Sequence, residues 1–119
     1  MAYVDGFVVP VPKDKLDKYR EAANKAGAIW CEHGALAYHE CIADDVKPGE
    51  VTSFPQSVLL KPDETVVFAW ILYDSRAQRD AVNAKVMNDP RMADMMKPES
   101  MPFDGKRMFW GGFQTMVDL

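Results

Sequence analysis

Four stretches of the chain are rich in β-branched, aromatic or alternating apolar residues, which predicts β-strands. They are Tyr3–Val11, Ala35–Ala43, Thr65–Tyr73 and Lys106–Val117. Between them, apolar residues recur at three- and four-residue steps, as on one face of a helix. The first helix is expected over Lys13–His33, and the second should run from Ser75 to about Asn88.

Local signals mark the ends of these elements. Gly34 follows the first helix, where a left-handed cap needs no Cβ, and Gly27 inside that helix predicts close packing against a neighbour. Ser75 and Gln78 form a capping box at the start of the second helix. Asp89 followed by Pro90 predicts a further short helix that carries Met92, Met95 and Met96.

The element order is β-α-β-β-α-β, the split βαβ pattern of a ferredoxin-like α+β fold. It predicts an antiparallel four-stranded sheet with two helices on one face. Asp44–Ser57 is expected to be a loop, and Val58–Leu60 would add a short strand. At roughly 150 residues per domain, residues 1–119 should form one domain.

Both faces of the predicted sheet are apolar, although two helices can cover only one. In the third strand, one face carries Val66, Phe68, Trp70 and Leu72, and the other carries Val67, Ala69, Ile71 and Tyr73. The uncovered face would measure roughly 500 Å². This is near the upper limit for the area of an exposed apolar patch on a monomer. The sequence therefore predicts a homodimer whose sheets stack face to face. Alternatively, the methionines of the short helix and the loop around Phe54 fold over this face.

Composition excludes several classes of partner. The chain has 119 residues, with 14 basic and 18 acidic side chains and a net charge of −4. This balance does not favour nucleic acid or an anionic membrane surface as a partner.

The longest apolar run, Val66–Tyr73, is far shorter than the roughly 20 residues of a membrane span. The N-terminal residues do not resemble a secretory signal, and Cys31 and Cys41 match no disulfide framework, so a cytoplasmic protein is expected.

Five segments resemble, as a set, the YbaA-like family of small, uncharacterised bacterial proteins. They are YVDGFVVPVPKDKLDKYR, EHGAL, DDVKPGEVTSFP, ETVVFAWILYDSRAQRDAVNAKVMNDPRM and MPFDGKRMFWGGF, which together cover nearly the whole chain. The family looks like part of the dimeric α/β-barrel superfamily, in which two ferredoxin-like subunits pair their sheets. The resemblance thus implies a dimeric α/β barrel. That superfamily includes cofactor-free and haem-degrading monooxygenases and lactone isomerases, but a shared fold does not assign chemistry.

Asp5 and His39 are the candidate catalytic residues. Asp5 is a lone carboxylate in a strand expected at the centre of the sheet, where burial would raise its pKa and make it an acid or base near neutral pH. Alternatively, it pairs with Arg107 or Lys106 on the last strand, or lies at a solvated strand end. His39 would be a proton shuttle. It shares one strand face with Cys41, but no third ligand is evident, so no metal site is predicted.

Trp70, Arg79, Asn83 and Arg107 are the candidate ligand-binding residues. Trp70 lies on the apolar third strand, where the alternative is a core position. Arg79 and Asn83 are four residues apart, so they share one helix face and would hold a small carboxylate or carbonyl group. The alternative is a solvated helix face. Arg107 follows the predicted turn at Asp104 and would bind an anion or tie the dimer together.

Two functions fit these residues. The first is a small-molecule enzyme of the cofactor-free oxygenase or isomerase type, with a polar cavity of about 300 Å³ or more beside Asp5 or His39. The second is a non-catalytic dimeric ligand-binding or stress-associated protein, with a filled core and a salt-bridged Asp5. No cofactor is predicted. The glycines match no phosphate-binding pattern, and Asp5 and Phe7 stand where haem-degrading members of the superfamily carry an Asn, with no histidine after His39.

Overall fold

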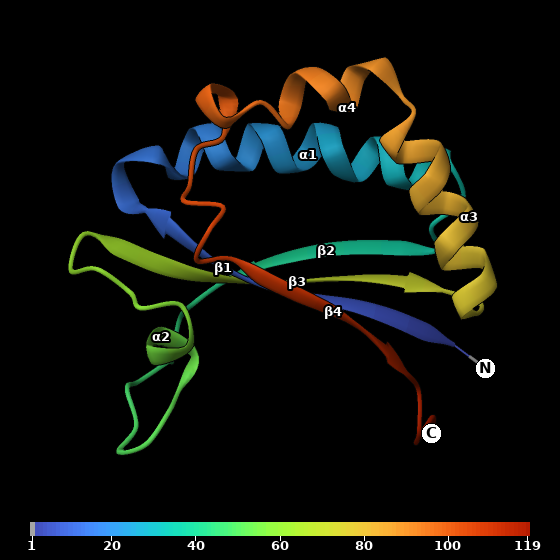
Figure 1. Cartoon of the computed structure of the whole chain (residues 1–119). Helices are drawn as coiled ribbons and strands as arrows, with labels where there is room; N and C mark the ends of the chain where they lie inside the picture. The colour runs from blue at the N-terminus through green and yellow to red at the C-terminus, as the bar shows by residue number, and fades with distance from the viewer. Residues whose placement is uncertain (1) are drawn as a thin grey trace.

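The computed structural model describes residues 2–119 and confirms the α+β, ferredoxin-like architecture (Figure 1). The first half contains β1 (Tyr3–Pro12), the 3-10 turn η1 (Lys13–Lys15), α1 (Leu16–Glu32), β2 (Ala37–Ile42), α2 (Phe54–Ser57) and β3 (Glu64–Tyr73). The second half contains α3 (Arg76–Met87), α4 (Pro90–Met95), the 3-10 turn η2 (Pro98–Ser100) and β4 (Phe109–Gln114). The strands form one antiparallel sheet in the order β2-β3-β1-β4.

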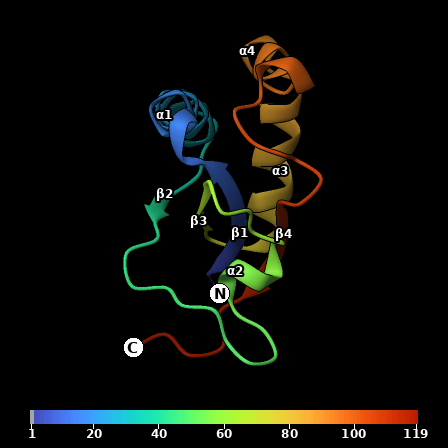
Figure 2. The same cartoon turned by 90° about the vertical axis from the view of Figure 1, so that its left-hand side faces the viewer.

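The molecule has a helical layer on one face of the sheet only. Helices α1, α3 and α4 lie on that face, and the segment with α2 lies on the other (Figures 1 and 2). We call these the helix face and the open face. Within residues 2–119, no helix has both the length and the apolar character needed to cross a membrane.

Strands β1 and β3 occupy the centre of the sheet because both are apolar on both faces. They pair along their whole length, from Tyr3 opposite Tyr73 to Pro12 opposite Glu64. Because side chains alternate across a strand, the odd-numbered residues of both strands point to the helix face, and most are buried. The core there includes Val9, Val11, Ile71 and Tyr73 from the sheet and Ile29, Val82 and Val86 from the helices.

The predicted helix signals act as expected. Ser75 Oγ accepts the backbone N–H of Gln78 at 3.1 Å, and Asp89 caps α4 by accepting the N–H of Arg91. Gly34 adopts φ = 120°, a conformation that side chains disfavour. At Gly27, an added Cβ would lie 2.6 Å from the Tyr38 ring, so the missing side chain lets α1 approach β2 closely.

The segment before β3 and the start of β4 differ from the predictions. Residues 58–60 form a turn rather than a strand, with Leu59 at φ = 50°. The carbonyls of Val58 and Leu59 accept hydrogen bonds from the Arg107 side chain instead of a neighbouring strand. Strand β4 begins at Phe109 because Lys106 lies in a turn whose backbone N–H is held by Asp104.

One end of the open face is covered by the chain itself. Val58 packs against Val8 and Val66, and the ring of Phe54 meets Phe68 edge-on at 6.0 Å. The alternative prediction, that the loop around Phe54 folds over the open face, is therefore correct for this end. The prediction that the methionines of the short helix also cover this face is wrong, because Met92 and Met95 pack on the helix face. Three aromatic side chains of the open face stay exposed, namely Phe68 (43%), Phe109 (46%) and Phe113 (66%).

Candidate functional site

Two cavities lie on the helix face, on the two sides of α1. The outer cavity, of about 440 Å³, lies along β2 and is lined by residues that include Leu16, Arg20, Asn24, Cys31 and Ile42. The inner cavity, of about 450 Å³, lies under α4 and the segment that follows it. Its walls are mostly apolar and include Phe7, Trp30, Ile71, Met92, Met95 and Phe103.

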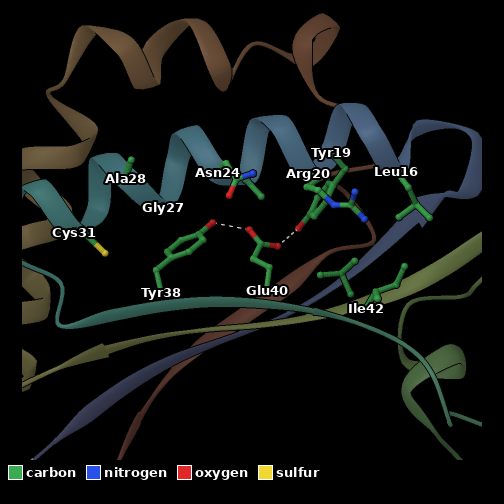
Figure 3. Close-up of a pocket in the computed structure, with 12 residues that line it drawn as sticks. Leu16, Tyr19, Arg20, Asn24, Gly27, Ala28, Cys31, Tyr38, Glu40 and Ile42 are labelled. Atoms are coloured by element: carbon green, nitrogen blue, oxygen red, sulfur yellow. Dashed lines mark hydrogen bonds between the residues drawn. The ribbon is translucent and has the colours of Figure 1, made fainter.

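A polar cluster of Tyr19, Tyr38 and Glu40 lines both cavities. The Tyr38 hydroxyl donates to Glu40 Oε2 at 2.5 Å, and the Tyr19 hydroxyl donates to Glu40 Oε1. Figure 3 shows the carboxylate between the two phenol rings, in the space between α1 and β2. We call these three residues the Glu40 cluster.

The fold places each member of this cluster for a local reason. Strand alternation turns Tyr38 and Glu40 of β2 toward α1, because each faces the same way as Ile71 or Ala69, their partners on β3. The bare backbone of Gly27 leaves room for the Tyr38 ring. Tyr19 comes from the first turns of α1, where its ring packs edge-on against Phe103 at 5.7 Å.

The electrostatics of the Glu40 cluster define its chemistry. Burial, and then the negative charge of Glu40, raise the pKa values of Tyr19 and Tyr38. Both phenols therefore stay protonated at neutral pH and act as donors. Among the ion pairs of residues 2–119, none includes Glu40. A carboxylate has about four acceptor positions, so this one still has acceptor capacity for a ligand.

Asp5, a predicted catalytic residue, lies on the helix face outside the two cavities. It is 1% exposed, and its cation is Arg79 of α3, with Arg79 Nη1 3.7 Å from Asp5 Oδ1. The expected pairing with Arg107 or Lys106 is therefore wrong. The residue opposite Asp5 on β4 is Gly112, and both basic residues precede that strand.

Arg79 and Asn83, two predicted ligand-binding residues, share one face of α3 as expected. Arg79 donates to the Tyr3 hydroxyl at 3.0 Å, and Asn83 Oδ1 accepts from Trp30 Nε1 at 3.1 Å. Asn83 Oδ1 also accepts from Tyr73 at 3.4 Å. These contacts bring Arg79 into one buried region with Asp5, and Arg79 Nη2 and Asn83 Oδ1 already bind other side chains.

We expect Asp5→Asn to leave the free energy of unfolding unchanged or to raise it at pH 7. Burial raises the pKa of Asp5 above its ordinary 3.8, although the Arg79 charge opposes this shift. Folding therefore disfavours the charged form, and the stability contributed by this carboxyl falls as pH rises through its folded pKa. Thermal denaturation at pH 7 and pH 4 tests this, and the two proteins should differ less at pH 4. A loss of about 3 kcal/mol would contradict it and indicate a tight ion pair.

His39 and Trp70 lie on the open face, opposite Asp5. Their rings stack with centroids 4.2 Å apart, because the two residues are direct partners across β2 and β3. The structure thus separates the two predicted catalytic residues by the sheet, and it separates Trp70 from Arg79. In the part of the chain that the structure covers, residues 2–119, no three His, Cys, Asp or Glu side chains are grouped to hold a metal ion.

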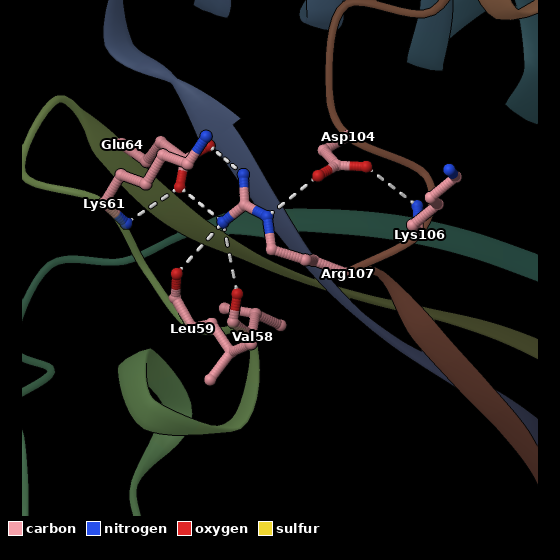
Figure 4. A network of polar contacts seen from close by, with 7 residues as sticks. All are labelled: Val58, Leu59, Lys61, Glu64, Asp104, Lys106 and Arg107. Atoms are coloured by element: carbon pink, nitrogen blue, oxygen red, sulfur yellow. Dashed lines mark hydrogen bonds and ion pairs between the residues drawn. The ribbon is translucent and has the colours of Figure 1, made fainter.

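Arg107, the last predicted ligand-binding residue, binds groups of its own chain (Figure 4). Its guanidinium donates to Glu64 at 2.7 and 2.6 Å and to Asp104 at 2.9 Å. It also donates to the carbonyls of Val58 and Leu59. Arg107 therefore ties the segment before β3 to the segment before β4.

Sequence reasoning did not single out the Glu40 cluster. A signal was present, because Glu40 is the only charged residue on a strand face that otherwise carries Leu36, Tyr38 and Ile42. Tyr19 had no such signal. It reads as one of the apolar positions of a helix, and its contact with Glu40 spans 21 residues of sequence.

Sequence comparisons identify the family of the chain. Residues 2–105 match the model of a family described as "Protein of unknown function (DUF1428)". The chain is 55% identical over 118 residues to "Uncharacterized protein YbaA" of Escherichia coli strain K12, with 99% of each chain covered. The YbaA of Shigella flexneri matches with the same identity and coverage.

Two solved structures share the fold at low sequence identity. One is a dimeric ferredoxin-like protein from an uncultured marine organism, with a TM-score of 0.59, 12% identity and 100% of both chains covered. The other is an uncharacterized NIPSNAP domain protein from Burkholderia xenovorans, with a TM-score of 0.57, 13% identity and coverage of 97% and 95%. By sequence, the chain belongs to the DUF1428 family and is a relative of YbaA, as its segments predicted.

Proposed function

We propose that this protein is a homodimeric small-molecule enzyme in which Glu40 transfers a proton on a ligand held between the sheet and the helices. The observation that carries this proposal is the Glu40 cluster, a carboxylate oriented by two phenols in the wall of cavities of about 440 and 450 Å³. Volumes in this range suit small organic ligands. Asp5 and His39 lie outside both cavities, so Glu40 takes the role that the sequence had proposed for them.

The geometry supports acid–base chemistry. Hydrogen bonds from Tyr19 and Tyr38 hold the carboxylate in place, so its free acceptor positions are oriented before a ligand binds. A carboxylate held in this way can accept a proton from a weak acid and return it at another atom, as an isomerase requires. A cofactor-free oxygenase would use the same first step and then dioxygen as a co-substrate.

A non-catalytic ligand-binding protein is the second candidate function. Asp5 Oδ1 lies 3.7 Å from Arg79 Nη1, which supports this function, whereas the filled core that it also predicted is replaced by two cavities. The two phenols also donate to both oxygens of Glu40, so the carboxylate has structural partners without any substrate. In that case the same cavities would bind a ligand without changing it.

The exposed, free thiols of Cys31 and Cys41 suit the reducing cytoplasm for either function.

Dimerisation through the open face completes the proposal. The open face carries exposed Phe109 and Phe113, and Phe68 is still 43% exposed beside Phe54 of α2. The uncovered part lies beside Trp70 and Leu72 on the same face. A solved structure of the same fold is titled a dimeric ferredoxin-like protein, which supports a second copy as the partner.

Replacing Glu40 by Gln is expected to slow proton transfer on a bound ligand by about 10²- to 10⁴-fold, the usual contribution of an acid–base group. We suggest 2-tetralone as the probe, because its two fused rings are apolar and its acidic C–H bonds exchange with solvent. Exchange in D2O, followed by NMR, measures the rate. Glu50→Gln, an exposed loop substitution, is the control and should leave the rate unchanged.

Two results would redirect the proposal. Binding of the probe without exchange above the buffer rate would favour the non-catalytic function. Equal exchange by the Glu40→Gln and parent proteins would remove Glu40 from the chemistry.

A further inference from the structure

We infer that the ligand of the inner cavity carries a protonated amine next to an apolar ring or chain, with Glu40 as its counter-ion. This inference rests on the proposed function, because it names the ligand of the same cavity. It begins with the charge of Glu40, which is half-buried and has no cationic partner among residues 2–119. A partly buried carboxylate without a cation leaves a negative charge in the cavity wall, and a bound ammonium group would pair with it.

The other charged residues of the inner cavity do not supply this cation. Lys18, Glu21, Lys25 and Asp94 contribute to its lining, but all four are exposed. Lys25 pairs with Glu21 at 3.4 Å on the solvent side of α1. Glu40 is therefore the one charged side chain of this lining that is not solvent-exposed.

The apolar walls suit an organic cation. Aromatic side chains of the lining include Phe7, Tyr19, Trp30, Tyr38 and Phe103, and aromatic faces attract ammonium groups. Five of the chain's eight methionines also line this cavity, namely Met92, Met95, Met96, Met101 and Met108. Their flexible, polarisable thioethers adapt to irregular apolar groups.

The charge of the whole chain also favours a cation. The net charge of −4 favours the approach of cations over anions. An anionic ligand would instead meet the Glu40 carboxylate in the cavity wall.

Three ligands with the same ring system test the inference by isothermal titration calorimetry at pH 7 and low salt. They are 2-aminotetralin, 2-hydroxytetralin and tetralin-2-carboxylate, which are cationic, neutral and anionic. We expect the amine to bind at least tenfold more tightly than the alcohol, and the carboxylate to bind most weakly. In Glu40→Gln, the amine and the alcohol should bind equally.

Two further variants keep the test decisive. Arg20→Gln removes a charge from the outer cavity and should preserve the preference for the amine. Tyr38→Phe removes one hydrogen-bond donor to Glu40 and should preserve or increase the preference for the amine. This variant is the second measurement if Glu40→Gln fails to fold.

The outcomes separate the two proposals. Equal binding of alcohol and amine by the parent protein, or a preference that survives in Glu40→Gln, would overturn the amine inference and leave the cavity function standing. Binding of none of the three ligands would overturn both.

Discussion

Arg107→Met is expected to lower the free energy of unfolding strongly, because it removes one partner of an ion pair whose other member is buried. The Arg107 and Glu64 side chains are 13% and 4% exposed, and two hydrogen bonds of 2.7 and 2.6 Å join them. Without Arg107, the Glu64 carboxylate would stay buried without its cation. The carbonyls of Val58 and Leu59 would also lose a donor.

Chemical denaturation at pH 7 measures this loss, and two further variants define its cause. Arg107→Met combined with Glu64→Leu should recover most of the stability, because no buried charge is left. Arg76→Met is the matched control. Arg76 is 73% exposed and pairs with Asp80 at 3.9 Å, so its loss should cost less than about 1 kcal/mol.

The effect of Arg107→Met should depend on pH in one direction. Hydrogen bonds from Arg107 lower the pKa of Glu64 below its ordinary 4.5. A carboxyl with a lowered folded pKa contributes its stability above its unfolded pKa, and that contribution is lost as the pH falls through the folded value. The parent protein and the variant should therefore differ most at neutral pH and less in acid. An equal difference at pH 7 and pH 3 would contradict the ion-pair explanation.

The arrangement of strands and helices was predictable because local residue patterns determine it. Alternation and apolar runs identified β1, β2 and β3, and the Ser75 and Asp89 caps located the starts of α3 and α4. The close packing at Gly27 was also correctly inferred. The strands and the caps depend on residues within one turn or one strand, where chemistry and spacing are visible in the sequence, and Gly27 is itself a visible signal although its contact is with β2.

The partners of charged side chains were not predictable in the same way. Strand β4 does lie beside β1, as the prediction for Asp5 assumed. The register, however, places Gly112 opposite Asp5, and the cation arrives from α3 above the sheet. Arg107 and Glu64 meet across 43 residues of sequence. Such pairs depend on strand register and helix placement, which a single sequence does not encode residue by residue.

The Glu40 cluster was missed for a related reason. Tyr38 and Glu40 were placed on the correct strand face, but nothing in the sequence showed that this face borders a cavity. That property depends on how far α1 stands from β2 and on the position of Tyr19 along the helix. Asp5 drew attention as a lone carboxylate in a central strand, and it is buried as expected. The outer cavity, in contrast, lies along the edge strand β2.

Phe113→Asp is expected to convert the protein from a dimer to a monomer. Phe113 is 66% exposed on the open face, opposite Val4 of β1. Stacking two open faces would remove at most roughly 1,000 Å² from water, about 500 Å² from each copy, which is near the lower limit for a specific interface. In a two-fold arrangement each substitution acts twice, so two carboxylates would be buried in an apolar contact.

Light scattering coupled to gel filtration at micromolar concentration measures the change. The parent protein should elute with about twice the 13.4 kDa chain mass, and Phe113→Asp should elute with the mass of a single chain. Met87→Asp is the control, because Met87 is 50% exposed on α3, on the helix face. It adds the same charge away from the contact and should remain dimeric. A parent protein of single-chain mass, or a dimer that survives both Phe113→Asp and Phe68→Asp, would exclude the open face as the interface.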